Sequence, residues 1–390
     1  DQMMMEVDLR STIGRIQKEL GDLEAAEPNL QKALILLERE YGLTHPLTRQ
    51  VKVLLAELWT EQGRYKDAEA RLESILLAVE DESQRDDPQV LAANNQLAIV
   101  MMSTLRLAEA HTLFFDTVER SRRVLGPDHP DTMEREVMLA MATSTLARLS
   151  GEIATTDLTP AFGSSSRIES ILGRLHPVTL KSRLAAQMLE FSKNQMVPTS
   201  ESLDEVVAIA EDLKLVVGAE HTDSLSALTI AGLFQLTFGD FASASITLRS
   251  SYEGFLRKYG RDHPETMAVA SLLGSALNGN GQYEEAAPLL ESSWYGQKQL
   301  WGEDDIRTIQ AESIWTMVMM NLGRFEQSMP HFEHVMEILP SYSISIIDRW
   351  VFGILLVRMS LELQFERIDE AVRTASRLRQ LVLARDDADS

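Results

Sequence analysis

Histidine recurs along this chain in one sequence context, and imidazole is the side chain best suited to metal binding or proton transfer near neutral pH. The recurring residues are His45, His129, His176, His221 and His263, each three residues after a glycine and all but one before a proline. Neighbouring members of this set are at least 42 residues apart, whereas a helical metal-binding pair has its ligands one turn apart. Because glycine and proline are turn residues, we expect these histidines to cap and pack turns.

A second set, His331 and His334, is spaced by one helical turn, with Glu333 and Glu337 beside it. It lacks the His-Glu-x-x-His spacing of zinc proteases, and the chain has no cysteine to complete a thiolate site. We expect an incidental pair on a solvated helix face. No Gly-Lys dipeptide occurs, which excludes a P-loop. The sequence therefore predicts no catalytic, metal or cofactor residues, and a protein that is not an enzyme.

A glycine that returns at a fixed interval shows which elements carry these turns. Gly21 and Gly63 are 42 residues apart, and the same interval separates Gly239, Gly281 and Gly323. A period of this length is typical of solenoids, in which one supersecondary unit repeats and packs against its neighbours. The segments between the landmarks have apolar residues at helical spacing, and strand signals are essentially absent. The sequence thus predicts an all-α solenoid.

The landmarks divide the chain into about nine helix–turn–helix units. The second helix of each unit is expected to begin just after Gly21, Gly63, Leu105, Glu152, Val197, Gly239, Gly281, Gly323 or Phe365. The histidine spacing widens in mid-chain, and residues 155–166 have loop composition. We expect an ordered loop there, with a joint in the superhelix as the alternative. This predicts hairpins over 1–150, irregular repeats with the insertion over 151–200, hairpins over 201–385 and a frayed tail over 386–390.

The composition favours an interaction protein with an acidic surface. The net charge is −22, so nucleic acid and membrane surfaces are not expected as partners. The longest apolar stretch, residues 350–357, is too short to span a bilayer. No secretory signal is visible, and we expect a cytoplasmic location. Because the first residue is Asp1, we also expect a fragment of a longer protein.

The repeating unit resembles the tetratricopeptide repeat, in the 42-residue variety of kinesin light chains and of fungal proteins in which such arrays follow a nucleotide-binding signalling domain. The resemblance rests on a small residue on the first helix and an alanine on the second. The small residues are Gly14, Ala56, Ala98, Ala140, Gly232, Gly274 and Thr316, and the alanines are Ala26, Ala68, Ala110, Ala244 and Ala286. It implies a right-handed α-solenoid that binds a protein or peptide.

In this repeat the first helices line the concave face, which the resemblance implies is the binding groove. The positions carried over are Asn95, Gln96, Ile99, Met102, Leu233, Leu236, Ser275, Asn278, Met317 and Met320. Leucine and methionine predict an apolar, adaptable surface in the C-terminal half, and core packing of the methionines is the alternative. Only Asn95 with Gln96 approaches the paired asparagines by which kinesin light chains grip a cargo peptide.

Three functions remain open. The first is the repeat region of a larger intracellular signalling protein, similar to fungal nucleotide-binding receptors, that senses a ligand or holds a partner domain inactive. The second is a cargo or scaffold adaptor of the kinesin-light-chain type. The third is an accessory repeat domain that is fused to an enzyme or binds a small molecule. The sequence indicates neither the ligand nor the oligomeric state.

Overall fold

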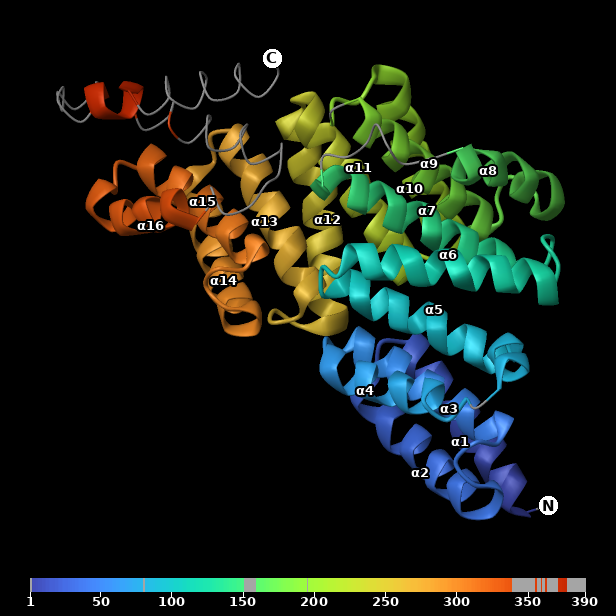
Figure 1. Ribbon diagram of the computed structural model, residues 1–390. Coiled ribbons are helices and arrows are strands. Elements are labelled where there is room, and N and C mark those ends of the chain that lie inside the picture. The colour runs from blue at the N-terminus through green and yellow to red at the C-terminus, as the bar shows by residue number, and fades with distance from the viewer. Residues whose placement is uncertain are drawn as a thin grey trace.

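The computed structural model describes residues 2–79, 81–150, 159–194 and 196–338, together with 355, 359, 362 and 371–376. These residues form helices and turns and contain no β-strand. The helices are α1 (Gln2–Glu19), α2 (Leu23–Tyr41), α3 (Pro46–Glu61), α4 (Tyr65–Leu76), the 3-10 helix η1 (Glu82–Asp86), α5 (Pro88–Ser103), α6 (Leu107–Val124), α7 (Pro130–Ser150), α8 (Thr159–Leu172), α9 (Pro177–Lys193), α10 (Ser200–Val217), α11 (Thr222–Phe238), α12 (Phe241–Tyr259), α13 (Pro264–Gly279), α14 (Tyr283–Trp301), α15 (Ile306–Asn321) and α16 (Phe325–Ile338). Consecutive helices pair into hairpins that stack along the chain, as Figure 1 shows. The predicted all-α solenoid is confirmed, and the second-helix start expected after Phe365 lies outside the described residues.

Most hairpins begin where a glycine stops the previous helix, whereas the third follows the 3-10 helix η1. Gly42, for example, has φ 84° and ends α2, because glycine adopts this left-handed conformation without steric cost. The next helix is then capped by a histidine whose Nδ1 accepts the backbone N–H two residues on, at 3.1–3.3 Å, in His45, His129, His176, His221 and His263. Asp87 and Asp305 do the same for α5 and α15. The capping role predicted for the histidines is confirmed.

Two turns within hairpins lack the glycine and still adopt its conformation. Leu105, between α5 and α6, has φ 60°, and Met196, between α9 and α10, has φ 59°. A side chain with a Cβ atom pays about 1–2 kcal/mol for this conformation. The chain therefore keeps the turn geometry of the repeat at these two positions and bears a local conformational cost.

Close approach of the paired helices explains the small residues that define the repeat. A Cβ atom added to Gly14, Gly232 or Gly274 would lie within 2.4–2.7 Å of Leu30, Leu248 or Leu290 on the partner helix. The alanines of the second helices, Ala26, Ala68, Ala110, Ala244 and Ala286, are all 0% exposed. Larger side chains at these positions would overpack the helix pair. The repeat register predicted from the sequence is thus the register of the structure.

The fourth hairpin departs from the pattern. Helix α8 runs from Thr159 to Leu172, so the predicted loop is wrong for residues 159–166, and residues 155–158 lie outside the described part. Proline is tolerated in a first helical turn, and burial of Ile168 at 0% exposure adds packing that loop-like composition does not reveal. Helix α7 packs more extensively against α9 than against α8. The two first helices here contact each other directly.

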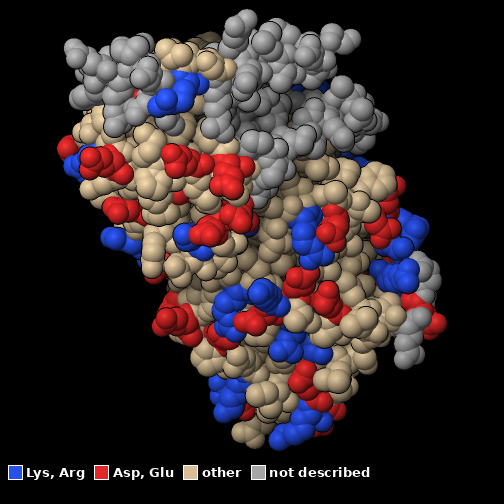
Figure 2. Space-filling view, turned by 60° about the vertical axis from the view of Figure 1, so that its left-hand side comes forward, with Lys and Arg blue, Asp and Glu red and all other residues tan. Residues whose placement is uncertain are grey.

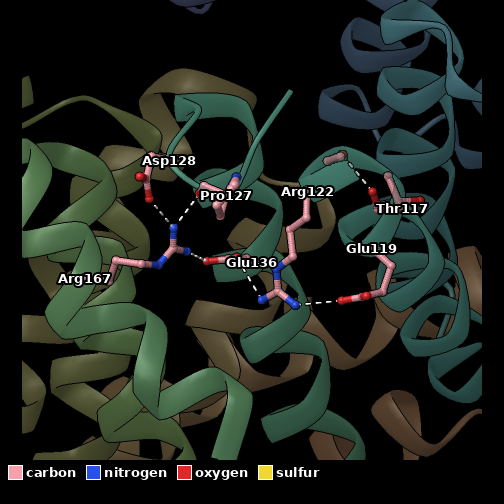
Figure 3. Close-up of polar contacts among 8 residues, drawn as sticks. Thr117, Glu119, Arg122, Pro127, Asp128, Glu136 and Arg167 are labelled. Atoms are coloured by element: carbon pink, nitrogen blue, oxygen red, sulfur yellow. Dashed lines mark hydrogen bonds and ion pairs between the residues drawn. The ribbon is translucent and has the colours of Figure 1, made fainter. Parts of the chain in front are cut away.

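A buried carboxylate fixes α8 in this irregular region (Figure 3). Glu136 of α7 is 3% exposed and accepts hydrogen bonds from Arg122 of α6, at 2.9 Å, and from Arg167 of α8. Arg167 also donates to the carbonyl oxygen of Pro127 at 2.5 Å and to Asp128 at 3.0 Å. The guanidinium of Arg167 therefore connects α8 to α7 and to the turn before α7.

The first helices form the inner side of the array. Neighbouring first helices, such as α3 with α5, α11 with α13 and α13 with α15, contact each other, whereas neighbouring second helices make little or no contact within the described residues. In a curved stack the inner elements lie closer together than the outer ones. The concave face is therefore built by α1, α3, α5, α7, α9, α11, α13 and α15, as the resemblance implied.

Candidate functional site

The predicted groove residues lie on four first helices, and most of them keep part of their surface accessible. The half-buried members are Asn95, Ile99 and Met102 of α5, Leu233 and Leu236 of α11, Ser275 and Asn278 of α13, and Met317 of α15. Their side chains pack partly on the core and keep part of their surface accessible. An extended or helical ligand on this face would meet apolar contacts and hydrogen-bonding amides on successive helices.

Two of the predicted groove residues are buried. Met320 is 1% exposed and belongs to a core cluster with Ile309 and Phe332, so its expected place on an open surface is wrong. Helix α16 and Leu355 cover the end of α15 at this point, which the sequence of α15 alone does not reveal. Gln96 is 8% exposed, and its Nε2 donates to Thr60 Oγ1 at 3.0 Å. Gln96 thus joins α5 to α3 and is a structural bridge between two hairpins.

The amides of Asn95 and Asn278 differ in what they leave available. The Oδ1 atom of Asn95 is buried and has no hydrogen-bond partner within the described residues. An unpaired buried acceptor costs free energy, so Asn95 Oδ1 is a local source of instability in α5. Asn278 accepts a hydrogen bond from Asn321 at 2.9 Å through its Oδ1, which leaves its own amide nitrogen unused by that bond.

At the N-terminal end the inner face is charged instead of apolar. Lys18 of α1 is 9% exposed and lies 2.9 Å from Glu57 and 3.3 Å from Glu61, both on α3. Burial alone would lower the pKa of Lys18, but the two carboxylates outweigh it and raise that pKa above its ordinary value. Burial raises the pKa of Glu61, against the pull of Lys18. The charges of these side chains pair with one another, so this part of the face has fewer groups available to a ligand than α5 and α11 have.

The array returns to itself after five hairpins, and first helices then meet end to end. Nε2 of His263, the residue that caps α13, lies 2.5 Å from the carbonyl oxygen of Glu61 at the end of α3. Arg307, at the start of α15, donates to the carbonyl oxygen of Ser103 at the end of α5, at 2.9 Å. In both junctions a donor at the N-terminus of one helix meets the C-terminal carbonyl of another, which the two helix dipoles favour.

A third junction completes this contact, which we call the seam. Lys258 donates to Thr222 at the start of α11 at 2.6 Å, and its aliphatic chain packs against Gly21 at the end of α1. Beside it, Pro264 packs against Gly63. The seam therefore joins α1 to α11, α3 to α13 and α5 to α15. These contacts bring the first helices of the two halves together end to end.

Comparison with known proteins agrees with this architecture. Family models described as tetratricopeptide repeat match residues 7–76 and residues 90–131. Tetratricopeptide repeats are thus shown for these two segments. A search of curated proteins gave no match. Within the described residues, no helix of the tetratricopeptide array combines the length and apolar character needed to cross a membrane.

Solved structures share the fold of the array over nearly its full length. A Rap protein complexed with Competence and Sporulation Factor aligns with 97% of this chain and 98% of its own, with a TM-score of 0.62 at 11% identity. The apo form of RapI aligns with 98% of this chain and 99% of its own, with a TM-score of 0.51 at 9% identity. A putative kinesin light chain of Podosopora anserina, with nearly identical TPR-like repeats, is 18% identical over 66% of this chain and 98% of its own, but its TM-score is only 0.30. At these identities the likeness to the Rap protein and RapI shows a common fold alone.

The His331 and His334 pair is not a solvated helix face, and that expectation is wrong. The Nδ1 atoms of the two rings lie 2.6 and 2.8 Å from the carboxylate oxygens of Glu312, which is 3% exposed. Burial would lower the pKa of His334, but its hydrogen bonds to Glu312 and Asp304 outweigh this and raise that pKa. No group of three His, Asp or Glu side chains in the described residues is arranged to hold a metal ion. The pair therefore supplies hydrogen-bond partners to a buried carboxylate of the array.

Proposed function

We propose that the tetratricopeptide array is a scaffold that binds a protein or peptide on its inner face. The observation that carries this proposal is the row of half-buried apolar and amide side chains on α5, α11, α13 and α15. Buried apolar anchors supply most of the affinity at such interfaces. The likeness to a Rap protein solved with a bound factor supports a ligand-binding use of this fold.

The charge distribution supports a polypeptide ligand in preference to nucleic acid. The chain carries a net charge of −22, and on the face drawn in Figure 2 the Lys and Arg side chains lie among Asp and Glu and do not form a continuous basic stripe. A phosphate backbone would be repelled by such a surface overall. We further propose, on the sequence resemblance alone, that the array is the repeat region of a larger cytoplasmic signalling protein.

The test selects peptides that bind the wild-type chain and measures their affinity for groove variants. Leu236→Asp and Met317→Asp place a carboxylate in the apolar row and should each weaken binding at least tenfold, while the far-ultraviolet circular dichroism stays helical. Ile246→Asp is the matched control, because Ile246 is 70% exposed on the second helix α12. Equal affinity of all three variants for the selected peptides would remove the inner face as the binding site.

A further inference from the structure

A separate hollow opens on the other side of the array, between the second helices α12 and α14. Its volume is about 250 Å³, and the first helix α13 forms its floor. The floor is apolar, with Ala270, Leu273 and Leu277 among its residues, whereas the rim carries Arg249 and Arg261. Because it lies between second helices, this hollow is distinct from the groove candidates on the first helices.

The hollow exists because the side chains at these positions are smaller than those at the equivalent positions of the next hairpin. Residues 42 positions on from Ala270, Leu273 and Ser292 are Glu312, Trp315 and His334. In that hairpin Trp315 stacks on Trp294 with ring centroids 5.5 Å apart, and His334 hydrogen-bonds to Glu312. These side chains of Trp315, His334 and Glu312 fill the space that corresponds to the hollow. Ala270 and Ser292 instead leave the space open over α13.

The charge at the mouth of the hollow is unusual for so acidic a chain. Arg249 is paired with Glu285 at 2.6 Å, so its charge is compensated. Arg261 is exposed, and within the described part of the chain it has no hydrogen bond or ion pair. One positive charge therefore remains uncompensated beside an apolar floor. A guanidinium presents parallel N–H groups that match a carboxylate.

We propose that this hollow binds a carboxylate carried by a single apolar or aromatic group. The carboxylate would pair with Arg261, and the apolar group would cover Ala270 and Leu273. The volume is below the roughly 300–1,000 Å³ of drug-sized sites but above the ~150 Å³ of an apolar cavity that holds benzene. It suits one side-chain-sized group, which either the C-terminal residue of a peptide or a small free acid supplies.

The experiment titrates the 390-residue chain calorimetrically with three probes. N-acetylphenylalanine carries the carboxylate, N-acetylphenylalaninamide replaces it with a neutral amide, and hydrocinnamate keeps the acid without the peptide group. The acid should bind at least tenfold more tightly than the amide. Hydrocinnamate that binds as tightly as N-acetylphenylalanine assigns the site to free acids, and weaker binding assigns it to peptide C-termini. Equal affinity for acid and amide overturns the proposal.

Three variants locate the binding. Arg261→Ala should lower the affinity for N-acetylphenylalanine at least tenfold, and Ser292→Trp should abolish binding by filling the hollow from its rim. Arg257→Ala is the control, because Arg257 lies near the same turn but pairs with Glu220. Arg261 is exposed, so its variant tests the proposal even where Ser292→Trp fails to fold. Unchanged affinity in Arg261→Ala, or loss of affinity in Arg257→Ala, shows that the acid binds elsewhere.

Discussion

The Nε2 atom of His263 lies 2.5 Å from the carbonyl oxygen of Glu61, 202 residues earlier in the chain. A carbonyl oxygen can only accept, so Nε2 carries the proton, and Nδ1 is free to accept the N–H of Glu265 at 3.2 Å. The neutral imidazole therefore caps α13 and closes the seam at the same time. A second proton on Nδ1 would oppose the cap. Burial lowers the pKa of His263 to about 4, although the Glu61 carbonyl acts in the opposite direction.

The first prediction follows from this pKa. In the unfolded chain a histidine has a pKa of about 6.5, so between that pH and about 4 the unfolded state binds a proton that the folded state excludes. The contribution of neutral His263 is therefore complete above about pH 6.5 and is lost as the pH falls toward 4, for a total of roughly 3 kcal/mol. Urea unfolding at pH 7 and pH 5 should show about 2 kcal/mol of this total.

His263→Asn tests whether this residue causes the pH dependence. Asparagine is a good N-cap but does not titrate, so the variant should unfold with a smaller loss of stability between pH 7 and pH 5 than the wild type. His45→Asn is the matched control, because His45 caps α3 in the same way and no contact across the seam is found for it. An unchanged pH dependence in His263→Asn would assign the effect to the neighbouring carboxylates.

The second prediction concerns the strained turn of the third hairpin. Leu105 has φ 60°, a conformation that costs a residue with a Cβ atom about 1–2 kcal/mol. Replacement by glycine removes this cost, but the greater entropy of glycine in the unfolded chain offsets part of the gain. Leu105→Gly should therefore stabilise the protein by about 0.5–1 kcal/mol. Leu125→Gly provides the comparison, because Leu125 has φ −96° and should gain nothing. A lower urea midpoint for Leu105→Gly than for wild type would mean that the leucine side chain contributes more by packing than the backbone loses by strain.

Features of the array that depend on neighbouring residues could be predicted from the sequence, and those that depend on distant ones could not. The turn glycines and capping histidines act within a few residues, so His45 and Gly42 could be assigned correctly. The contact of His263 with Glu61 depends on how five hairpins accumulate their curvature, which no local pattern contains. Burial of Met320 depends on α16 and Leu355, and the helical state of residues 159–166 depends on packing of Ile168. The groove candidates on α5, α11 and α13 rest on the repeat register alone and stay a prediction.

The third prediction tests that register through the close approach of α11 and α12. Ala244 is 0% exposed, and the added atoms of a leucine would press into the packed helix pair. Ala244→Leu should cost roughly 1–3 kcal/mol in the free energy of unfolding. Ala242→Leu, at an exposed position two residues earlier on the same helix, should change it by less than about 0.5 kcal/mol. Equal midpoints for the two variants in urea would contradict the observed packing.

The last prediction concerns the carboxylate that holds the irregular fourth hairpin. Glu136 is 3% exposed and bonds to both Arg122 and Arg167, so Glu136→Ala leaves two guanidinium groups without their shared partner. Removing one member of a buried ion pair costs about 3–5 kcal/mol, and the partial exposure of the arginines, 34% and 29%, reduces this to roughly 2 kcal/mol.

Glu119→Ala separates the buried contact from ordinary surface charge. Glu119 pairs with the same Arg122 at 2.7 Å but is 52% exposed, so its loss should cost less than about 1 kcal/mol. Urea unfolding gives both free energies, and hydrogen exchange of α8 reports where the loss occurs. Because Arg167 joins α8 to α7 through Glu136, amides of α8 should exchange faster in Glu136→Ala while those of α2 and α14 keep their wild-type protection. Equal costs for the two variants, with α8 still protected, would show that packing of Ile168 alone holds this helix in place.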